Sequence, residues 1–205
     1  MRLYHHPQST NARRAVMTAV HLGTPVELVM VDFAKGEHRQ PQFLKLNPNH
    51  KVPVLDDDGF VLWESQAIMQ YLCDLTPGQR LYPGAIRARA DVNRWLFWSA
   101  QHFGPAVAIL NWEHWVKGRL GLGGADPDEV KRGEALVREF AAILDTHLAG
   151  REWICAGGLS LADLSLGACL TYTERSHLPL GGFGHLGRWL AQVQTLEAWK
   201  TTEPA

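Results

Sequence analysis

The sequence predicts two domains of different class, a small mixed α/β domain followed by a domain built only of helices. Short apolar runs of strand character alternate with helical repeats up to residue 75. A stretch rich in proline and glycine follows at 77–84, and strand signals stop beyond it. We therefore predict a first domain at 1–77, a linker at 78–86 and an all-helical second domain at 87–205.

Four elements are expected in the first half of the α/β domain: a strand at 2–4, a helix at 12–20, a strand at 26–31 and a short helix through 43–46. Small apolar side chains at helical spacing predict the first helix, and Gly23-Thr24-Pro25 ends it. The run at 26–31 is almost continuously apolar, as in a strand buried on both faces. Asn47-Pro48 stops the second helix, because the residue before a proline avoids helical backbone angles.

The second half of this domain adds a strand pair and a third helix. The expected elements are a strand at 52–55, a hairpin turn at 56–59, a returning strand at 60–62 and a helix at 64–75. Asp58-Gly59 is a typical two-residue hairpin signal, and Ile68, Leu72 and Leu75 share one helical face. The resulting order implies a small mixed sheet with helices packed against it.

The second domain has a helical pattern throughout. Residues 87–120 are helical and dense in aromatic side chains, which pack in cores or line apolar pockets. Asp126-Pro127-Asp128-Glu129 begins a helix that keeps its period to Leu148. Ser160-Leu161-Ala162-Asp163 resembles a capping box that opens a helix to about Ser176, with shorter helices from Leu186.

Composition argues against several functional classes. The formal net charge of -1 gives no reason to expect a nucleic acid or an anionic membrane as partner. No apolar run approaches the roughly 20 residues that span a bilayer. The opening residues 1–7 lack the apolar core of a secretory signal, so we expect none.

The cysteines and histidines show no metal-binding pattern. Cys73, Cys155 and Cys169 are far apart, form no CxxC pair and lie in apolar neighbourhoods, which is typical of small buried side chains. The 10 histidines form no cluster at ligand spacing, so no metal site is expected. A reducing cytoplasm suits unpaired thiols.

Val52-Pro53 lies where a strand is expected to begin. A cis peptide bond before the proline would turn the Val52 backbone N–H and C=O toward an extended peptide ligand. A cis bond at this point costs only about 0.5–1 kcal/mol. The alternative is an ordinary trans proline at a strand start.

Glu64-Ser65 opens a predicted helix. A helix start offers unpaired N–H groups and the positive end of the dipole, which suit a carboxylate. The Ser65 hydroxyl adds a donor, and the Glu64 carboxylate can accept an ammonium group. The alternative is that one of the two side chains only caps the helix.

In this order and spacing, the motifs resemble those of the glutathione transferases. The matching segments are Pro7-Gln8-Ser9, Arg13-Arg14, Gly36-Glu37-His38, Val52-Pro53, Glu64-Ser65 and Ser160-Leu161-Ala162-Asp163. The His6-Pro7 opening is most similar to phi-type and related bacterial serine enzymes. The resemblance implies a thioredoxin-like N-terminal domain that binds glutathione, a helical C-terminal domain that contributes the hydrophobic substrate site, and a homodimer.

By this resemblance Ser9 carries the chemistry, with Thr10 and Asn11 as alternatives; all three could also simply cap the helix. The glutathione thiol has a pKa of about 8.5, and only the thiolate attacks. Ionising it at neutral pH takes about 2–3 kcal/mol. A helix dipole supplies about 0.3–1 kcal/mol and a hydroxyl donor about 1.5–3 kcal/mol, so the two together suffice.

The resemblance also implies how the rest of the ligand is held. Val52 and Pro53 hold the cysteinyl backbone, Glu64 and Ser65 the γ-glutamyl end, and His38 and Lys51 the glycine carboxylate. Arg13-Arg14 is interpreted as a solvated charged face or a link to the second domain. The candidates for the hydrophobic substrate site, a cleft between the first turn and the first long helix of the second domain, are Phe103, Leu110, Trp112 and Trp115.

The predicted function is therefore a cytoplasmic glutathione transferase that adds the thiolate to a hydrophobic electrophile, as in detoxification. One alternative is a glutathione-dependent peroxidase or thiol transferase, which shares the same thiolate. Another is a non-catalytic binding protein that keeps the fold. No cysteine occupies the turn at 7–11, which argues against relatives that form a disulfide there.

Overall fold

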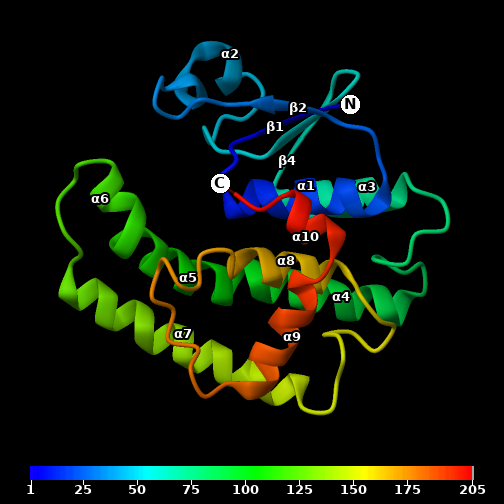
Figure 1. The fold of residues 1–205 in the computed structure, drawn as a ribbon. Helices are drawn as coiled ribbons and strands as arrows, with labels where there is room; N and C mark the ends of the chain where they lie inside the picture. The colour runs from blue at the N-terminus through cyan, green and yellow to red at the C-terminus, as the bar shows by residue number, and fades with distance from the viewer. Residues whose placement is uncertain (205) are drawn as a thin grey trace. The chain divides into compact units, whose positions relative to one another are not determined.

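The computed structural model describes residues 1–204, which form two compact units (Figure 1). The first unit contains Met1–Pro83 and the segment from Leu196 onward, and the second contains Gly84–Thr195. The C-terminal segment belongs to the first unit because α10 (Glu197–Thr201) packs against α1 (Thr10–Leu22). The domain boundaries derived from the sequence remain a prediction.

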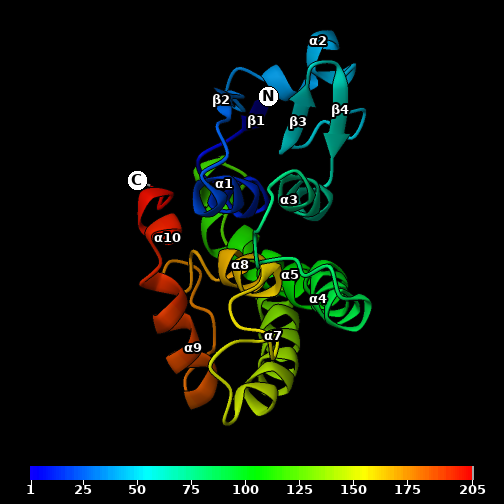
Figure 2. The ribbon, with the colours of Figure 1, turned by 90° about the vertical axis from the view of Figure 1, so that its right-hand side faces the viewer.

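The first unit is built on a four-stranded mixed sheet in the order β2-β1-β3-β4. Its strands are β1 (Arg2–His5), β2 (Glu27–Met30), β3 (Val54–Asp57) and β4 (Phe60–Trp63). Strand β1 runs parallel to β2, and β3 runs antiparallel to both of its neighbours. Helices α1 and α3 (Ser65–Asp74) cover one face, whereas α2 (Pro41–Leu44) and the 3-10 turn η1 (Glu37–Arg39) lie on the other (Figures 1 and 2). The predicted α/β fold class is confirmed.

Alternation along the strands divides the side chains between two cores. Leu3 and Leu55 are opposite each other in the sheet and are fully buried against α1 and α3. The next pair, Tyr4 and Val54, points to the other face, where Phe43 of α2 packs. This alternation is the ordinary two-residue period of a strand, and it gives the two faces different coverage.

Two strand predictions need correction, and one turn prediction is confirmed. Strand β2 is largely exposed rather than buried on both faces, because it lies at the edge of the sheet. Strand β3 begins at Val54 rather than at Val52. Between β3 and β4, Asp58 and Gly59 have φ angles of 49° and 95°. Positive φ at both central residues is what a two-residue hairpin turn requires.

The expected solvated face at Arg13-Arg14 is wrong, because both side chains are buried. The Arg13 guanidinium lies 3.9 Å from the centroid of the Trp199 ring, and its Nη2 donates to the Trp199 carbonyl at 2.9 Å. A planar guanidinium can stack and donate at once, which an ammonium cannot. Arg13 therefore ties α10 to α1.

The second unit consists of helices joined by loops and has no strand in the described residues. Its helices are α4 (Ile86–Trp98), α5 (Gly104–Asn111), α6 (Lys117–Arg119), α7 (Pro127–Leu148), α8 (Leu161–Cys169) and α9 (Gly184–Gln194). Two π-helical turns, η2 (Ser99–Phe103) and η3 (Trp112–Val116), interrupt the run expected at 87–120. Helix α8 ends at Cys169, before the predicted limit near Ser176. None of the helices within residues 1–204 has both the length and the apolar character needed to cross a membrane.

Asp163 joins three parts of the second unit and confirms the predicted capping box. Its fully buried carboxylate accepts the Ser160 backbone N–H and hydroxyl, each at 2.9 Å. It also accepts the Ile154 N–H at 3.0 Å and the Trp189 indole N–H at 2.8 Å. The start of α8, the preceding loop and α9 thus share one buried acceptor.

We predict that Asp163→Asn lowers the free energy of unfolding by about 2–4 kcal/mol, because its amide group would face the two Ser160 donors and leave them unpaired. Urea denaturation of the full chain measures this. Asp128→Asn, an exposed acid in the first turn of α7, is the control and should change stability by less than about 0.5 kcal/mol. Equal stability of the two variants would contradict the prediction.

Candidate functional site

The directions of the strands bring several chain segments to one end of the sheet, which is the end where β1, β2 and β4 finish. Strands β1, β2 and β4 run the same way, so their C-terminal ends lie together with the start of β3. The register aligns Tyr4, Val54 and Trp63 in one row across β1, β3 and β4. The turn before α1, the loop before β3 and the start of α3 therefore all leave the sheet at this end, as does the segment that follows β2.

Ser9 lies in the turn between β1 and α1. The Ser9 N–H donates to the His6 carbonyl at 2.9 Å, and the Gln8 N–H donates to the His6 ring Nδ1 at 3.2 Å. The Ser9 hydroxyl oxygen is the N-cap of α1 and accepts the Ala12 N–H at 3.2 Å. A hydroxyl can accept and donate at the same time, so capping leaves its proton available for a ligand.

The two alternatives to Ser9 stand in different positions. Thr10 is the first residue of α1 and is half-buried, whereas Asn11 is exposed. Within residues 1–204, Ser9 is the only one of the three with a recorded side-chain hydrogen bond. Because Ser9 precedes the first helical residue, its hydroxyl is held at the positive end of the α1 dipole.

The loop before β3 carries the second group of predicted residues. The Val52-Pro53 peptide bond is cis, and both residues are buried. Asn47 holds this loop in place, because its buried side-chain amide donates to the Lys51 carbonyl at 2.7 Å and its Oδ1 accepts the Asn49 N–H at 3.0 Å. The Lys51 residue is exposed. Sequence reasoning treated Asn47 only as a helix stop and missed its role in shaping the loop.

Helix α3 begins at Ser65, one residue after the predicted start, and Glu64 is its N-cap residue. Glu64 has φ 72° and ψ 111°, a conformation that non-glycine residues rarely adopt. Its side chain makes no capping hydrogen bond, so the capping alternative does not account for Glu64. Strain of this kind, at about 1–3 kcal/mol, concentrates at functional sites.

A row of rings connects the Ser9 turn with His38. The His6 ring stacks on Phe33 at a centroid distance of 4.4 Å, and Phe33 meets the His38 ring at 4.8 Å. The His50 ring lies 6.4 Å from His38. His50 immediately precedes Lys51, and sequence reasoning missed it because nothing in its local pattern marks it. The imidazoles of His6 and His50 therefore accompany the predicted His38 at this end of the sheet.

The pKa of His38 is below its usual value, chiefly because burial disfavours the charged ring. The nearby charges of Arg39 and His50 lower this pKa further. His38 is therefore neutral near pH 7 in the absence of a ligand. An anionic ligand next to the ring would favour the imidazolium form.

The four predicted residues of the hydrophobic substrate site differ in accessibility. Phe103 and Leu110 are fully buried inside the second unit, with Phe103 stacked on Trp98 at 5.6 Å between centroids. Trp112 is 42% exposed and Trp115 is half-buried. Only the two tryptophans thus have surface that a ligand could touch, and the assignment of the set remains a prediction.

The surroundings of Trp112 and Trp115 include a π-helical turn and two side chains that the sequence pattern did not reveal. Trp112 and Trp115 lie in the π-helical turn η3, and such turns occur frequently at functional sites. The Trp115 ring lies 4.4 Å from Tyr172, and the Arg175 guanidinium lies 5.1 Å from the Trp115 ring. Tyr172 and Arg175 follow α8 in sequence, so only the tertiary fold brings them to Trp115.

The thiols and the metal-ligating side chains offer no further centre in the described residues. Cys73, Cys155 and Cys169 are buried, as expected, and none of them forms a disulfide within residues 1–204. Burial raises the pKa of the Cys155 thiol to about 12, so it stays protonated. Within residues 1–204, no group of three or more His, Cys, Asp or Glu side chains is arranged to hold a metal ion.

Comparison with known families finds two domain models of one family, one in each half of the chain. Residues 1–74 match the model of the glutathione S-transferase N-terminal domain, and residues 127–199 match the model of the C-terminal domain.

Solved structures agree over nearly the whole length. A delta-class glutathione transferase from Nilaparvata lugens is 30% identical, with a TM-score of 0.83 over 98% of this chain and 94% of that one. Glutathione transferase F7 from Populus trichocarpa is 25% identical, with a TM-score of 0.89 over 98% and 96% of the two chains. A glutathione S-transferase domain-containing protein from Marinobacter aquaeolei VT8 is 26% identical, with a TM-score of 0.85 over 97% and 100%.

We predict that Glu64→Gly raises the free energy of unfolding by about 1 kcal/mol, because glycine adopts a positive φ without strain. Glu64→Ala is the matched control, since it removes the same carboxylate but keeps the strained backbone, and it should not stabilise the chain. Thermal unfolding of both variants beside the natural sequence measures the difference. A Gly variant no more stable than the Ala variant would show that Glu64 is not strained.

Proposed function

Because the chain belongs to the glutathione S-transferase family, we propose that it binds glutathione and transfers the thiolate of this tripeptide to a hydrophobic electrophile. The observation that carries the proposal is the convergence of the α1 turn, the loop with the cis bond and the start of α3 at one end of the sheet. Each of these segments offers a group that one part of glutathione can use.

Ser9 is proposed to stabilise the thiolate. Its hydroxyl oxygen is engaged by the Ala12 N–H, which orients the group and leaves the proton to donate to sulfur. The start of α1 adds the favourable end of a helix dipole. Ser9 acts as a donor to the nucleophile and is not itself the nucleophile.

The other groups are proposed to hold the tripeptide along its length. The backbone of Val52 pairs with the cysteinyl residue, next to Pro53. The Glu64 carboxylate takes the γ-glutamyl ammonium group, and the Ser65 hydroxyl with the first N–H groups of α3 takes the adjoining carboxylate. The positive φ of Glu64 supports this role, because strained backbone is retained where function requires it.

The glycine carboxylate is proposed to lie against His38 and Lys51, with His50 as an additional contact. The proximity of the His38 and His50 rings supports placing both imidazoles at the same ligand group. Lys51 is exposed and brings a permanent positive charge next to Val52.

The reaction is proposed to be attack of the thiolate on an electrophilic carbon. A carbon–sulfur bond forms as the bond to a leaving group breaks, and the leaving group departs as an anion; in an addition, the new carbanion takes a proton from water. Trp112 and Trp115 are proposed to contact the electrophile with their accessible aromatic surface. The buried Phe103 and Leu110 are proposed to pack beneath that surface.

The proposal extends to the serine-type, phi-like subclass, to a homodimer and to the cytoplasm. Large apolar side chains left exposed in both units favour association with a second copy; they include Trp63 on β4 and Ile86 and Phe97 on α4. The three cysteines form no disulfide in the described part of the chain, which suits a reducing compartment.

We predict that Ser9→Ala lowers kcat/KM with a chlorinated dinitrobenzene by about tenfold to a few hundredfold at neutral pH. The pKa of the bound thiol, followed by the ultraviolet absorbance of the thiolate, should rise by about 1–2 units. Thr10→Ala and Asn11→Ala are the matched controls. Full activity of Ser9→Ala together with loss of activity in Asn11→Ala would move the role to Asn11.

The same assays distinguish the proposed reaction from related ones. Reduction of an organic hydroperoxide without conjugation of the arene would indicate a peroxidase instead. Absence of glutathione binding in calorimetry would reject the proposed function altogether.

We also predict that S-methylglutathione, in which a methyl thioether replaces the ionisable thiol, binds more tightly as the pH falls from about 7.5 to 5.5. The reason is that the ligand carboxylate raises the lowered pKa of His38, so binding takes up a proton. His38→Gln should flatten this slope. His21→Gln, whose ring also has a pKa lowered by burial but lies at the far end of α1, should keep it. An unchanged slope in His38→Gln would remove His38 from the carboxylate site.

A further inference from the structure

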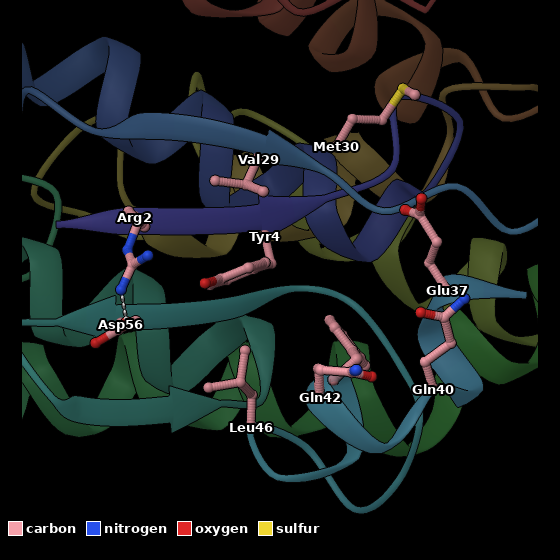
Figure 3. A pocket seen from close by; sticks show the side chains of 10 residues that line it. Arg2, Tyr4, Val29, Met30, Glu37, Gln40, Gln42, Leu46 and Asp56 are labelled. Carbon is pink, nitrogen blue, oxygen red and sulfur yellow. Dashed lines mark hydrogen bonds and ion pairs between the residues drawn. The ribbon is translucent and has the colours of Figure 1, made fainter.

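A hollow of about 400 Å³ lies in the first unit, on the face of the sheet opposite α1 and α3 (Figure 3). Its volume is within the range of small-molecule sites. Side chains from β1, β2, β3, η1 and α2 line it, and none of the residues proposed above to bind glutathione is among them.

The hollow exists because α2 is too short to cover this face. The helix has only four residues, and its Phe43 packs against Tyr4 at 6.2 Å between ring centroids. Arg2 and Asp56 line the hollow toward the start of β1, and Val29 lines it beside Tyr4. The sheet thus forms a floor, and η1 and α2 form one wall.

One end of the hollow offers hydrogen-bond donors. Arg2 Nη2 donates to Asp56 Oδ2 at 2.7 Å, and the Asp56 Oδ1 accepts the Gly59 N–H at 2.9 Å. A guanidinium has five N–H groups, so the half-exposed Arg2 keeps donors for a ligand. The Tyr4 hydroxyl points toward this end and has no recorded hydrogen bond within residues 1–204 (Figure 3). The buried Asp56 is held in place by both of its partners.

The opposite end offers acceptors. Figure 3 places Glu37 and Gln40 together, away from the Arg2–Asp56 pair. One oxygen of the Glu37 carboxylate accepts the Asp32 N–H at 2.7 Å, which fixes the side chain. The other oxygen and the exposed Gln40 amide have no recorded partner in the described part of the chain.

The span between the two ends is mainly apolar, with the Gln42 amide toward the acceptor end (Figure 3). The Tyr4 ring, Val29 and Leu46 lie between the donor end and the acceptor end (Figure 3). An ion pair at one end, a carboxylate at the other and a mainly apolar middle disfavour several ligand classes. Glu37 and Asp56 disfavour a polyanion, Arg2 disfavours a simple cation, and a purely apolar molecule would leave the charged groups desolvated and unpaired.

We infer that this hollow is a second binding site, for a short zwitterionic peptide with an apolar side chain. The peptide carboxylate binds Arg2 and the Tyr4 hydroxyl, its ammonium group binds Glu37 and Gln40, and its side chain packs on Val29 and Leu46. The inference does not depend on the proposed transferase activity, because no residue is shared between the two sites.

The test uses the full chain and the dipeptide Val-Leu, followed by NMR of the backbone amides. Binding should shift the amides of Tyr4, Val29 and Gln40 while the amides of Ser9 and Val52 stay in place. The N-acetylated dipeptide lacks the ammonium group and the dipeptide amide lacks the carboxylate, so each should bind about tenfold more weakly or not at all.

Variants assign the contacts. Tyr4→Phe removes only the hydroxyl and should weaken Val-Leu binding about tenfold. Val29→Trp should abolish binding by filling the hollow. The matched control is Tyr71→Phe, whose hydroxyl donates to Asp57 outside the hollow, and it should bind like the natural chain. A backbone-amide spectrum as well dispersed as that of the natural chain shows that each variant folds.

Three results would overturn the inference. The first is no amide shift at millimolar Val-Leu, and the second is equal binding of the free and the two blocked dipeptides. The third is a set of shifts confined to Ser9 and Val52, which would mean that the dipeptide occupies the glutathione site instead.

Discussion

Strand direction is the constraint on which the candidate site depends. Strands β1, β2 and β4 run one way and β3 runs the other. The segments that follow β1, β2 and β4 therefore lie at the same end of the sheet as the loop that precedes β3. The burial of Leu3 and Leu55 against α1 and α3 holds the two helices to the sheet, and both helix starts then face the same end. Ser9, Val52 and Glu64 therefore lie in segments that meet the same end of the sheet, although more than 50 residues of sequence separate the first from the last.

The site that results is made of backbone as much as of side chains. The start of α3, the loop shaped by Asn47 and the turn at Ser9 all present main-chain groups that no helix or strand uses. In the proposed function, the side chains then have modest tasks. A hydroxyl that already caps a helix needs only to donate its proton, and a carboxylate on a strained residue needs only to stay where the backbone holds it.

The two faces of the sheet show how coverage decides what a surface can do. The face under α1 and α3 is closed by fully buried side chains. The other face carries the four-residue helix α2 and the turn η1, which leave a hollow between polar ends.

In the second unit, Asp163 fixes the start of α8, because four donors converge on one buried carboxylate. The arrangement of α8, α9 and the loop before α8 thus depends on one buried carboxylate whose hydrogen bonds are satisfied.

Local signals in the sequence by themselves determined where elements begin and turn. Asp58-Gly59 specifies the hairpin, Ser160 with Asp163 specifies the start of α8, and the motifs around Ser9, Val52 and Glu64 specify the family. These features depend on residue types and backbone conformation within a few residues of sequence. Only the tertiary structure decided that β2 is an exposed edge, that Arg13 is buried under Trp199 and that Phe103 and Leu110 are core side chains. Burial depends on which distant elements pack together, and no local pattern contains that information.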